Sequence, residues 1–203
     1  MYNTALEASY DARAAASWER ASTILSRLLA EAGPDALEGD SRVRFAERAF
    51  TLLRPLMADT ITQSRTHASR QLRAMGVKGA VAPDLTDITL TQGDVYNLLA
   101  ASARYFFATG NRKDYTDPAV KADAFRYAVQ LAGRQAITLL SERRLEAASR
   151  TYENGGIRIY ERYLGSGDHC DLCKQIAGTR VTRQDIKPVH DRCTCGVRPL
   201  RTR

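Results

Sequence analysis

Residues 157–173 read Ile-Arg-Ile-Tyr-Glu-Arg-Tyr-Leu-Gly-Ser-Gly-Asp-His-Cys-Asp-Leu-Cys, and the pattern of the chain changes within this stretch. Its first part, residues 157–164, alternates with a period of two and is rich in β-branched and aromatic side chains, which is typical of a β-strand. Asn154-Gly155-Gly156 precedes it and closes a long segment of helical periodicity. The stretch therefore predicts a boundary between a helical body, residues 1–154, and a small C-terminal β-rich unit, residues 155–203.

The helical body contains four segments in which apolar side chains recur every three or four residues. We expect helices over residues 4–32, 40–76, 91–110 and 117–154, with a loop over residues 77–90. Pro55 lies inside the second segment and should bend or split that helix, because proline removes a backbone donor and crowds the preceding turn. The fold class predicted by this pattern is mainly α, with an elongated helical hairpin or bundle.

The C-terminal unit is expected to contain two further short strands, at residues 178–182 and 195–198. Three strands of this length do not hold together by themselves in water. A bound metal ion that ties their loops would supply the missing stability. The sequence therefore predicts a zinc-stapled β unit at the end of the helical body.

Every cysteine of the chain lies in two short patches of this unit. Cys170 and Cys173 have the C-x-x-C spacing that lets two thiolates of one tight turn meet a single ion. Strand-like alternation would put the sulfurs of Cys193 and Cys195 on one face, and His190 precedes them by a loop's reach. These five side chains predict a structural Zn2+ site.

Zinc takes four ligands in a closed structural site, so one of the five donors is spare. We favour the set Cys170, Cys173, His190 and Cys195. Cys193 is then the spare donor, although Cys193 and His190 could exchange these roles. His169 is a weaker candidate, because its neighbour Cys170 would already occupy the site.

Other chemistries remain open for the cysteines. Two disulfides would require an oxidising environment during or after assembly. A redox-active C-x-x-C is less favoured, since the sequence lacks the βαβ setting of thioredoxin-like proteins. Catalytic zinc would require water at one ligand position, and five candidate donors favour a closed site instead.

The chain has a net charge of +7, with 44% hydrophobic and 26% charged residues, which is ordinary for a globular protein. No apolar run is long enough to span a bilayer, and no secretory leader is recognised, so we expect folding in a reducing cytoplasm and no membrane partner. Residues 1–40 are acidic, whereas residues 41–80 and the segment from Thr151 onward are basic. This balance indicates polyanions or acidic protein surfaces as partners, or a solvated arginine-rich face.

The C-terminal elements resemble the motif of the phage Mu F-like minor head proteins, in which a strand, a C-x-x-C turn and a glycine-led strand precede a Pro-x-His segment and Cys-x-Cys. The matching parts are Ile157–Leu164, Cys170–Cys173, Gly178, Pro188–His190 and Cys193–Cys195. The resemblance covers about the last fifty residues. The helical part is similar only in general organisation, to shorter head proteins of actinobacterial phages. Asp191-Arg192 replaces the Pro-Pro or Pro-x-His-x-Asn run that is frequent in the family.

The resemblance implies a minor capsid protein that acts in head morphogenesis, in the virion or procapsid at the portal vertex or head interior, and in the host cytoplasm during assembly. It implies portal or major capsid subunits as partners, several copies per particle, and possible contact of arginine-rich faces with packaged DNA. Some members of the group are described as capsid maturation proteases, which is the first alternative. A nucleic-acid-binding zinc knuckle is the second, because arginines surround the cysteine patches.

His67 is the one histidine outside the cysteine patches and is therefore the candidate base for a protease site. Ser64 and Ser69 lie near it in sequence, but no orienting acid has an obvious spacing and no oxyanion element is recognisable. Gly165-Ser166-Gly167 does not follow a strand and open a helix, as a nucleophile elbow does. We therefore assign no catalytic residue and expect a protein that is not an enzyme, with His67 at the surface or in a helix–helix contact.

Overall fold

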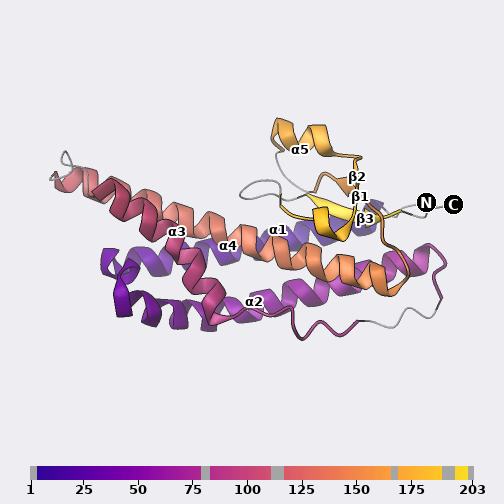
Figure 1. Cartoon of the computed structure of the whole chain (residues 1–203), viewed down its shortest axis with the longest axis horizontal. Coiled ribbons are helices and arrows are strands. Elements are labelled where there is room, and N and C mark those ends of the chain that lie inside the picture. The colour runs from indigo at the N-terminus through magenta and orange to yellow at the C-terminus, as the bar shows by residue number, and fades with distance from the viewer. Residues whose placement is uncertain (1–3, 79–82, 111–116, 166–168, 189–194, 201–203) are drawn as a thin grey trace. The chain divides into compact units, whose positions relative to one another are not determined.

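The structure, a computed structural model, describes residues 4–78, 83–110, 117–165, 169–188 and 195–200. The described chain is mainly helical, with a small antiparallel sheet near its C-terminal end (Figure 1). Its elements are α1 (Thr4–Ala32), η1 (Pro34–Leu37), α2 (Gly39–Ala74), α3 (Gln92–Gly110), α4 (Pro118–Asn154), β1 (Tyr160–Tyr163), α5 (Asp171–Ile176), β2 (Arg180–Val181), η2 (Arg183–Asp185) and β3 (Gly196–Pro199). The predicted fold class, mainly α with a small C-terminal sheet, is confirmed.

The four long helices begin and end at the residues that the sequence marks. Gly33, at φ +78°, follows α1 in the left-handed region that favours glycine. Thr91 and Asp94 form a reciprocal capping box before α3, with each side chain accepting the other residue's backbone N–H at 2.8–3.0 Å. Asp117 caps α4, because its Oδ1 accepts the N–H of Ala119 at 2.8 Å.

Pro55 does not split the second helix, which runs as one element through it. The ring leaves the carbonyl of Thr51 without its usual intrahelical donor. Both Thr51 and Pro55 are exposed, so water can satisfy that carbonyl. The exposed position explains why a proline is tolerated here. Of the two predicted effects, the split is wrong and the bend stays a prediction.

The first strand is shorter than predicted, because the first residues of the predicted strand belong to the C-terminal cap of α4. The N–H of Ile157 donates to the carbonyl of Tyr152 at 2.9 Å, and the N–H of Gly156 donates to that of Glu153 at 2.9 Å. Gly156 has φ +80°. This Schellman arrangement ties Ile157 to the helix and delays the sheet until Tyr160.

The sheet has the order β2–β1–β3, and both pairings are antiparallel. Tyr160 lies opposite Val181 on one side and opposite Pro199 on the other. Tyr163, at the other end of β1, lies opposite Gly196. The central strand is therefore the one that the alternating sequence identified, and the two shorter strands flank it.

Contacts group the chain into two compact units. Unit 1 comprises residues 1–18, 57–89 and 138–203, and unit 2 comprises residues 19–56 and 90–137. The C-terminal sheet thus belongs to the same unit as parts of α1, α2 and α4. The predicted boundary after residue 154 concerns independent folding and stays a prediction.

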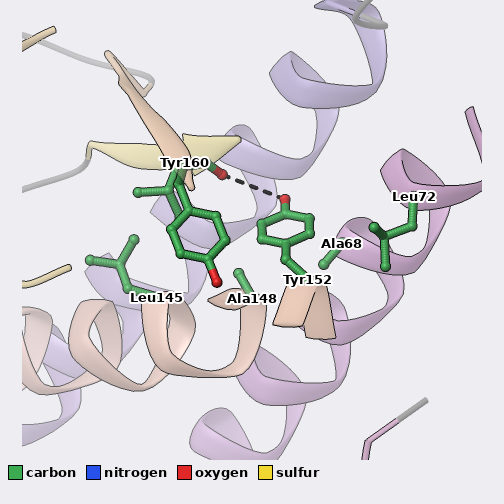
Figure 2. Packing of buried hydrophobic residues seen from close by; sticks show 7 residues of the cluster. Ala68, Leu72, Leu145, Ala148, Tyr152 and Tyr160 are labelled. Atoms are coloured by element: carbon green, nitrogen blue, oxygen red, sulfur yellow. Dashed lines mark hydrogen bonds between the residues drawn. The ribbon is translucent and has the colours of Figure 1, made fainter. Parts of the chain in front are cut away.

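The core of unit 1 joins the sheet to the helices. Buried side chains of α2 and α4 meet those of β1 and β3 in one cluster (Figure 2), whose members are Ala68, Leu72, Leu145, Ala148, Tyr152, Tyr160 and Val197. The rings of Tyr152 and Tyr160 lie 5.7 Å apart between their centroids. Three strands that could not fold alone thus gain their stability from an apolar contact with helices as well.

Unit 2 depends on close approach between α1 and α4. Gly133 and a row of buried alanines, Ala124, Ala128, Ala132 and Ala136, line the inner face of α4. A Cβ built on Gly133 would lie 2.4 Å from the Oγ of Ser26, 2.7 Å from the Oγ of Ser22 and 3.3 Å from the carbonyl oxygen of Ser22. Only a residue without a side chain fits between the two helices at this point.

We expect Gly133→Ala to lower the thermal stability, although alanine is the better helix former. The added methyl would displace the Ser26 hydroxyl from its bond to the carbonyl of Val129 and press on the backbone of Ser22. Overpacking of this kind costs about 1–3 kcal/mol. Thermal unfolding followed by circular dichroism measures the change.

Gly93→Ala is the matched control for this prediction. Gly93 also lies in a helix, but its Cβ would meet only the Oγ of Thr91 at 3.6 Å. The same substitution should therefore raise the free energy of unfolding there by about 0.5–1 kcal/mol. Equal shifts for the two variants would contradict the close helix approach.

Candidate functional site

The C-x-x-C segment forms the start of a short helix and not the tight turn that the spacing predicted. Cys170 is the N-cap residue of α5, and its Sγ accepts the N–H of Cys173 at 3.4 Å. Asp171 in the first turn and Lys174 in the last turn have the charges that suit the helix dipole. The helix places the side chains of Cys170 and Cys173 one turn apart.

Cys173 and Cys195 are brought together from opposite ends of the C-terminal segment. Cys173 is 1% exposed, Cys195 is 3% exposed, and the two pack in one cluster. Cys195 immediately precedes β3, so the pairing of that strand with β1 sets its position. Cys170 is exposed. His190 and Cys193, the other two predicted ligands, lie outside the described residues.

The donor chemistry of the described cysteines suits a thiophilic ion such as zinc, since two buried thiols lie together and a third begins the same helix. Within the part of the chain that the structure describes, no group of three or more His, Cys, Asp or Glu side chains is arranged to hold a metal ion. The described residues by themselves therefore do not form the predicted zinc site, whose remaining candidate donors, His190 and Cys193, lie outside them.

His169 is turned to a backbone partner. Its Nε2 lies 2.9 Å from the carbonyl oxygen of Gly165. A ring nitrogen in that contact donates its proton to the carbonyl, which leaves only the other nitrogen for a metal. A metal-bound histidine commonly donates its other ring N–H to a backbone carbonyl, so this contact does not weaken His169 as a ligand, and its rank as the weaker candidate stays a prediction.

The strand that follows Cys195 begins with a glycine that lies beside an aromatic ring. A Cβ on Gly196 would lie only 2.3–2.5 Å from atoms of the Tyr163 ring, so the ring lies directly over the glycine. The Tyr163 hydroxyl then reaches Oδ1 of Asp11 at 3.2 Å. The residue next to Cys195 is therefore fixed to α1 of unit 1 through Tyr163.

A buried polar cluster, which the sequence did not reveal, surrounds Arg144 of α4. Arg144 is 2% exposed, forms an ion pair with Asp11, and donates from Nε to the Tyr10 hydroxyl at 2.9 Å. Its guanidinium also lies 4.4 Å from the Tyr10 ring centroid and 5.1 Å from that of Trp18. Burial raises the pKa of Asp11, whereas the adjacent Arg144 lowers it, and burial prevails.

A second chain of hydrogen bonds lies in the same core. The Tyr152 hydroxyl donates to Oε1 of Gln71 at 2.8 Å, and Nε2 of Gln71 donates to Oε1 of Glu7 at 3.1 Å. Burial raises the pKa of Glu7. Together with the pair of Asp11 and Arg144, this chain fixes the first part of α1 against α2 and α4 within unit 1.

His67 lies in a helix–helix contact, one of the two environments expected for it. Its ring stacks on Tyr10 of α1 with 4.0 Å between centroids and 8° between planes. It is 4% exposed, and neither ring nitrogen has a hydrogen-bond partner among the described residues. The hydroxyl of Ser64, one turn earlier, donates to the carbonyl of Arg144 at 2.7 Å. Ser64 is thus engaged with the backbone and is not aligned with a base.

Burial, together with the charges of Arg144, Arg70 and Arg13, lowers the pKa of His67 to about 4. The folded state therefore keeps His67 neutral at a pH at which the unfolded chain binds a proton. The free energy of unfolding is therefore highest above pH 6.5. It decreases as the pH falls toward 4, because the unfolded chain then binds a proton at His67 and the folded chain does not. We expect a loss of about 2 kcal/mol from His67 between pH 8 and pH 5.

Urea unfolding of wild type and of His67→Phe at several pH values measures this effect. Phenylalanine keeps the stack on Tyr10 but binds no proton, so the variant should lose less stability between pH 8 and pH 5. His169 and His190 are present in both proteins and cancel in the comparison. Parallel pH profiles for the two proteins would contradict the burial of a neutral His67.

A surface groove of about 740 Å3 in unit 1 lies between the later turns of α4 and η2. Its walls carry both signs of charge, and four of these charged residues form two ion pairs. Arg183 contacts Glu153 at 3.1 Å, and Arg143 contacts Glu146 at 3.3 Å. A groove whose charges are paired in this way does not select a ligand of one sign.

In the described residues, no helix combines the length and the apolar character that crossing a bilayer requires. The chain was also compared with protein-family models, curated proteins and solved structures. None of the three comparisons finds a match. The features of the molecule that bear on function are the cysteine cluster, the buried polar cluster and the distribution of charge.

Proposed function

We propose that this chain is a minor head protein of a tailed bacteriophage, similar to the Mu F-like proteins, and that its C-terminal unit holds a structural zinc ion. The observation that carries the proposal is the buried pairing of Cys173 with Cys195 beside the N-cap Cys170. The order of β1, the C-x-x-C segment, β2 with Gly178 two residues before it, and β3 with Cys195 directly before it supports the resemblance. Portal or major capsid subunits are the proposed partners, in a virion or procapsid with several copies of the chain.

The proposed zinc ion would be bound by Cys170, Cys173, Cys195 and one donor from residues 189–194, with His190 favoured over Cys193. When bound, zinc supplies four strong bonds that close the segment and no reaction chemistry. The chain's own residues place the sulfurs. The α5 helix orients two of them, and Gly196 with Tyr163 fixes the strand that directly follows the third. We assign no catalytic residue.

Metal analysis of protein purified under reducing conditions tests the site. We expect about one zinc per chain, and loss of that zinc in Cys173→Ser and in Cys195→Ser. His169→Ala is the control, since His169 is not a favoured ligand. His190→Ala should also lose zinc, whereas Cys193→Ser should keep it.

Two results would overturn the zinc proposal. Fully reduced protein without zinc would remove it, and two disulfides found by mass spectrometry would support the alternative pairing of the cysteines. Zinc retained in His190→Ala but lost in Cys193→Ser would keep the site and exchange the two ligands.

Assembly of particles tests the role in the head. In co-expression with portal and major capsid proteins, we expect the chain to co-purify with procapsids in far fewer copies than the major capsid protein. Cys173→Ser should reduce its incorporation and His169→Ala should not. Absence of the wild-type chain from purified procapsids would contradict the head-protein role while leaving the zinc result intact.

A further inference from the structure

The second half of α2 carries a concentrated and uncompensated positive charge. Besides His67, residues 60–78 contain three arginines and one lysine. They contain no aspartate or glutamate. Asp59 is the last acid before this segment, and it accepts a hydrogen bond from Gln63 at 2.6 Å. An exposed helix that served only for solubility would be expected to mix both signs of charge.

The basic residues and the hydroxyl residues of this segment lie on one face of the helix. At 3.6 residues per turn, six positions fall within an arc of about 140°. We call this surface the α2 basic face, and its members are Arg65, Arg70, Arg73, Thr62, Thr66 and Ser69. All six are exposed or half-buried, while Ser64, His67, Ala68 and Gln71 face the core on the opposite side.

The three arginines of the α2 basic face have no carboxylate partner among the described residues, as judged from every ion pair that the structure gives. Several arginines of the C-terminal unit are engaged instead. Arg183 pairs with Glu153, and Arg198 pairs with Glu161. The three arginines of the α2 basic face thus differ from these paired arginines in having their charges open to a partner.

A neighbouring helix carries one more exposed arginine near α2. Arg13 of α1 is exposed, and its charge acts on His67 together with those of Arg70 and Arg144. Each of the charges that shifts the pKa of His67 is thus positive.

We propose that the α2 basic face binds the phosphate backbone of double-stranded DNA without reading its sequence. Arginine contacts phosphate with two parallel hydrogen bonds, and serine and threonine hydroxyls are common phosphate donors. The face presents these groups along about 12 Å of a single helix, since eight residues separate Arg65 from Arg73. A helix of this kind fits the major groove of B-form DNA, which is about 12 Å wide.

The composition of the face separates duplex DNA from other partners. Single-stranded nucleic acids are bound largely by stacking on aromatic side chains, and the face has none. The major groove of double-stranded RNA is too narrow to admit a helix. A protein partner would be expected to cover apolar or aromatic side chains at the centre of the interface. The inference does not depend on the head-protein role or on zinc, because α2 alone carries it.

Fluorescence anisotropy with a mixed-sequence duplex of about 30 base pairs, at several salt concentrations, tests the proposal. If three phosphates are neutralised, the association constant of the wild type should fall by about 40-fold between 50 and 200 mM salt. The triple variant R65Q/R70Q/R73Q should bind at least about tenfold more weakly at the lower salt and lose most of this salt dependence. R65K/R70K/R73K keeps the charges and should keep most of the binding.

The matched control is R44Q/R48Q/R54Q, which removes the same charge from exposed positions in the first half of the same helix. It should retain both the affinity and the salt dependence. Circular dichroism of each variant checks that the helices are intact. Absence of wild-type binding, equal losses in the two glutamine variants, or preferred binding of a single-stranded probe would each overturn the proposal.

Discussion

The buried charge of Arg144 is the constraint on which the architecture of unit 1 depends. A guanidinium without a partner in the core would cost several kcal/mol, so α4 can be buried here only if Asp11 is brought to it. The hydroxyls of Tyr10 and Tyr163 also bond to Arg144. These bonds fix the orientation of the first part of α1 and of the end of β1 relative to α4. The apolar cluster around Tyr152 packs in this same arrangement.

This polar core determines the position of the cysteines as well. Tyr163 reaches Asp11 only because Gly196 leaves room for its ring, and Gly196 is paired with Tyr163 in the sheet. Cys195, the residue directly before Gly196, is thereby held against Cys173. A metal ion, where present, would add to a geometry that packing and hydrogen bonds already favour, unlike small zinc modules that have no other core.

Local signals made most of the fold predictable, and long-range pairing accounts for what was missed. Helix periodicity, Gly33 and Asp117 gave the helices within one or two residues. The C-x-x-C spacing suggested a turn, although Asp171 and Lys174 already had the order that is typical of a short helix. The cluster of Arg144 could not be predicted, because its ionic partner is 133 residues away and nothing in either local sequence marks the pair.

The composition of unit 1 has a consequence for biosynthesis. It contains the first turns of α1 and also β3, so a ribosome must make the chain through about residue 199 before all of its parts can meet. Until Arg144 has been made, Asp11 lacks its ionic partner, and early folding must proceed through other segments. Contacts of such large sequence separation slow the final folding step. The chain loses conformational entropy when it closes the long loop, before burial of apolar surface lowers the free energy.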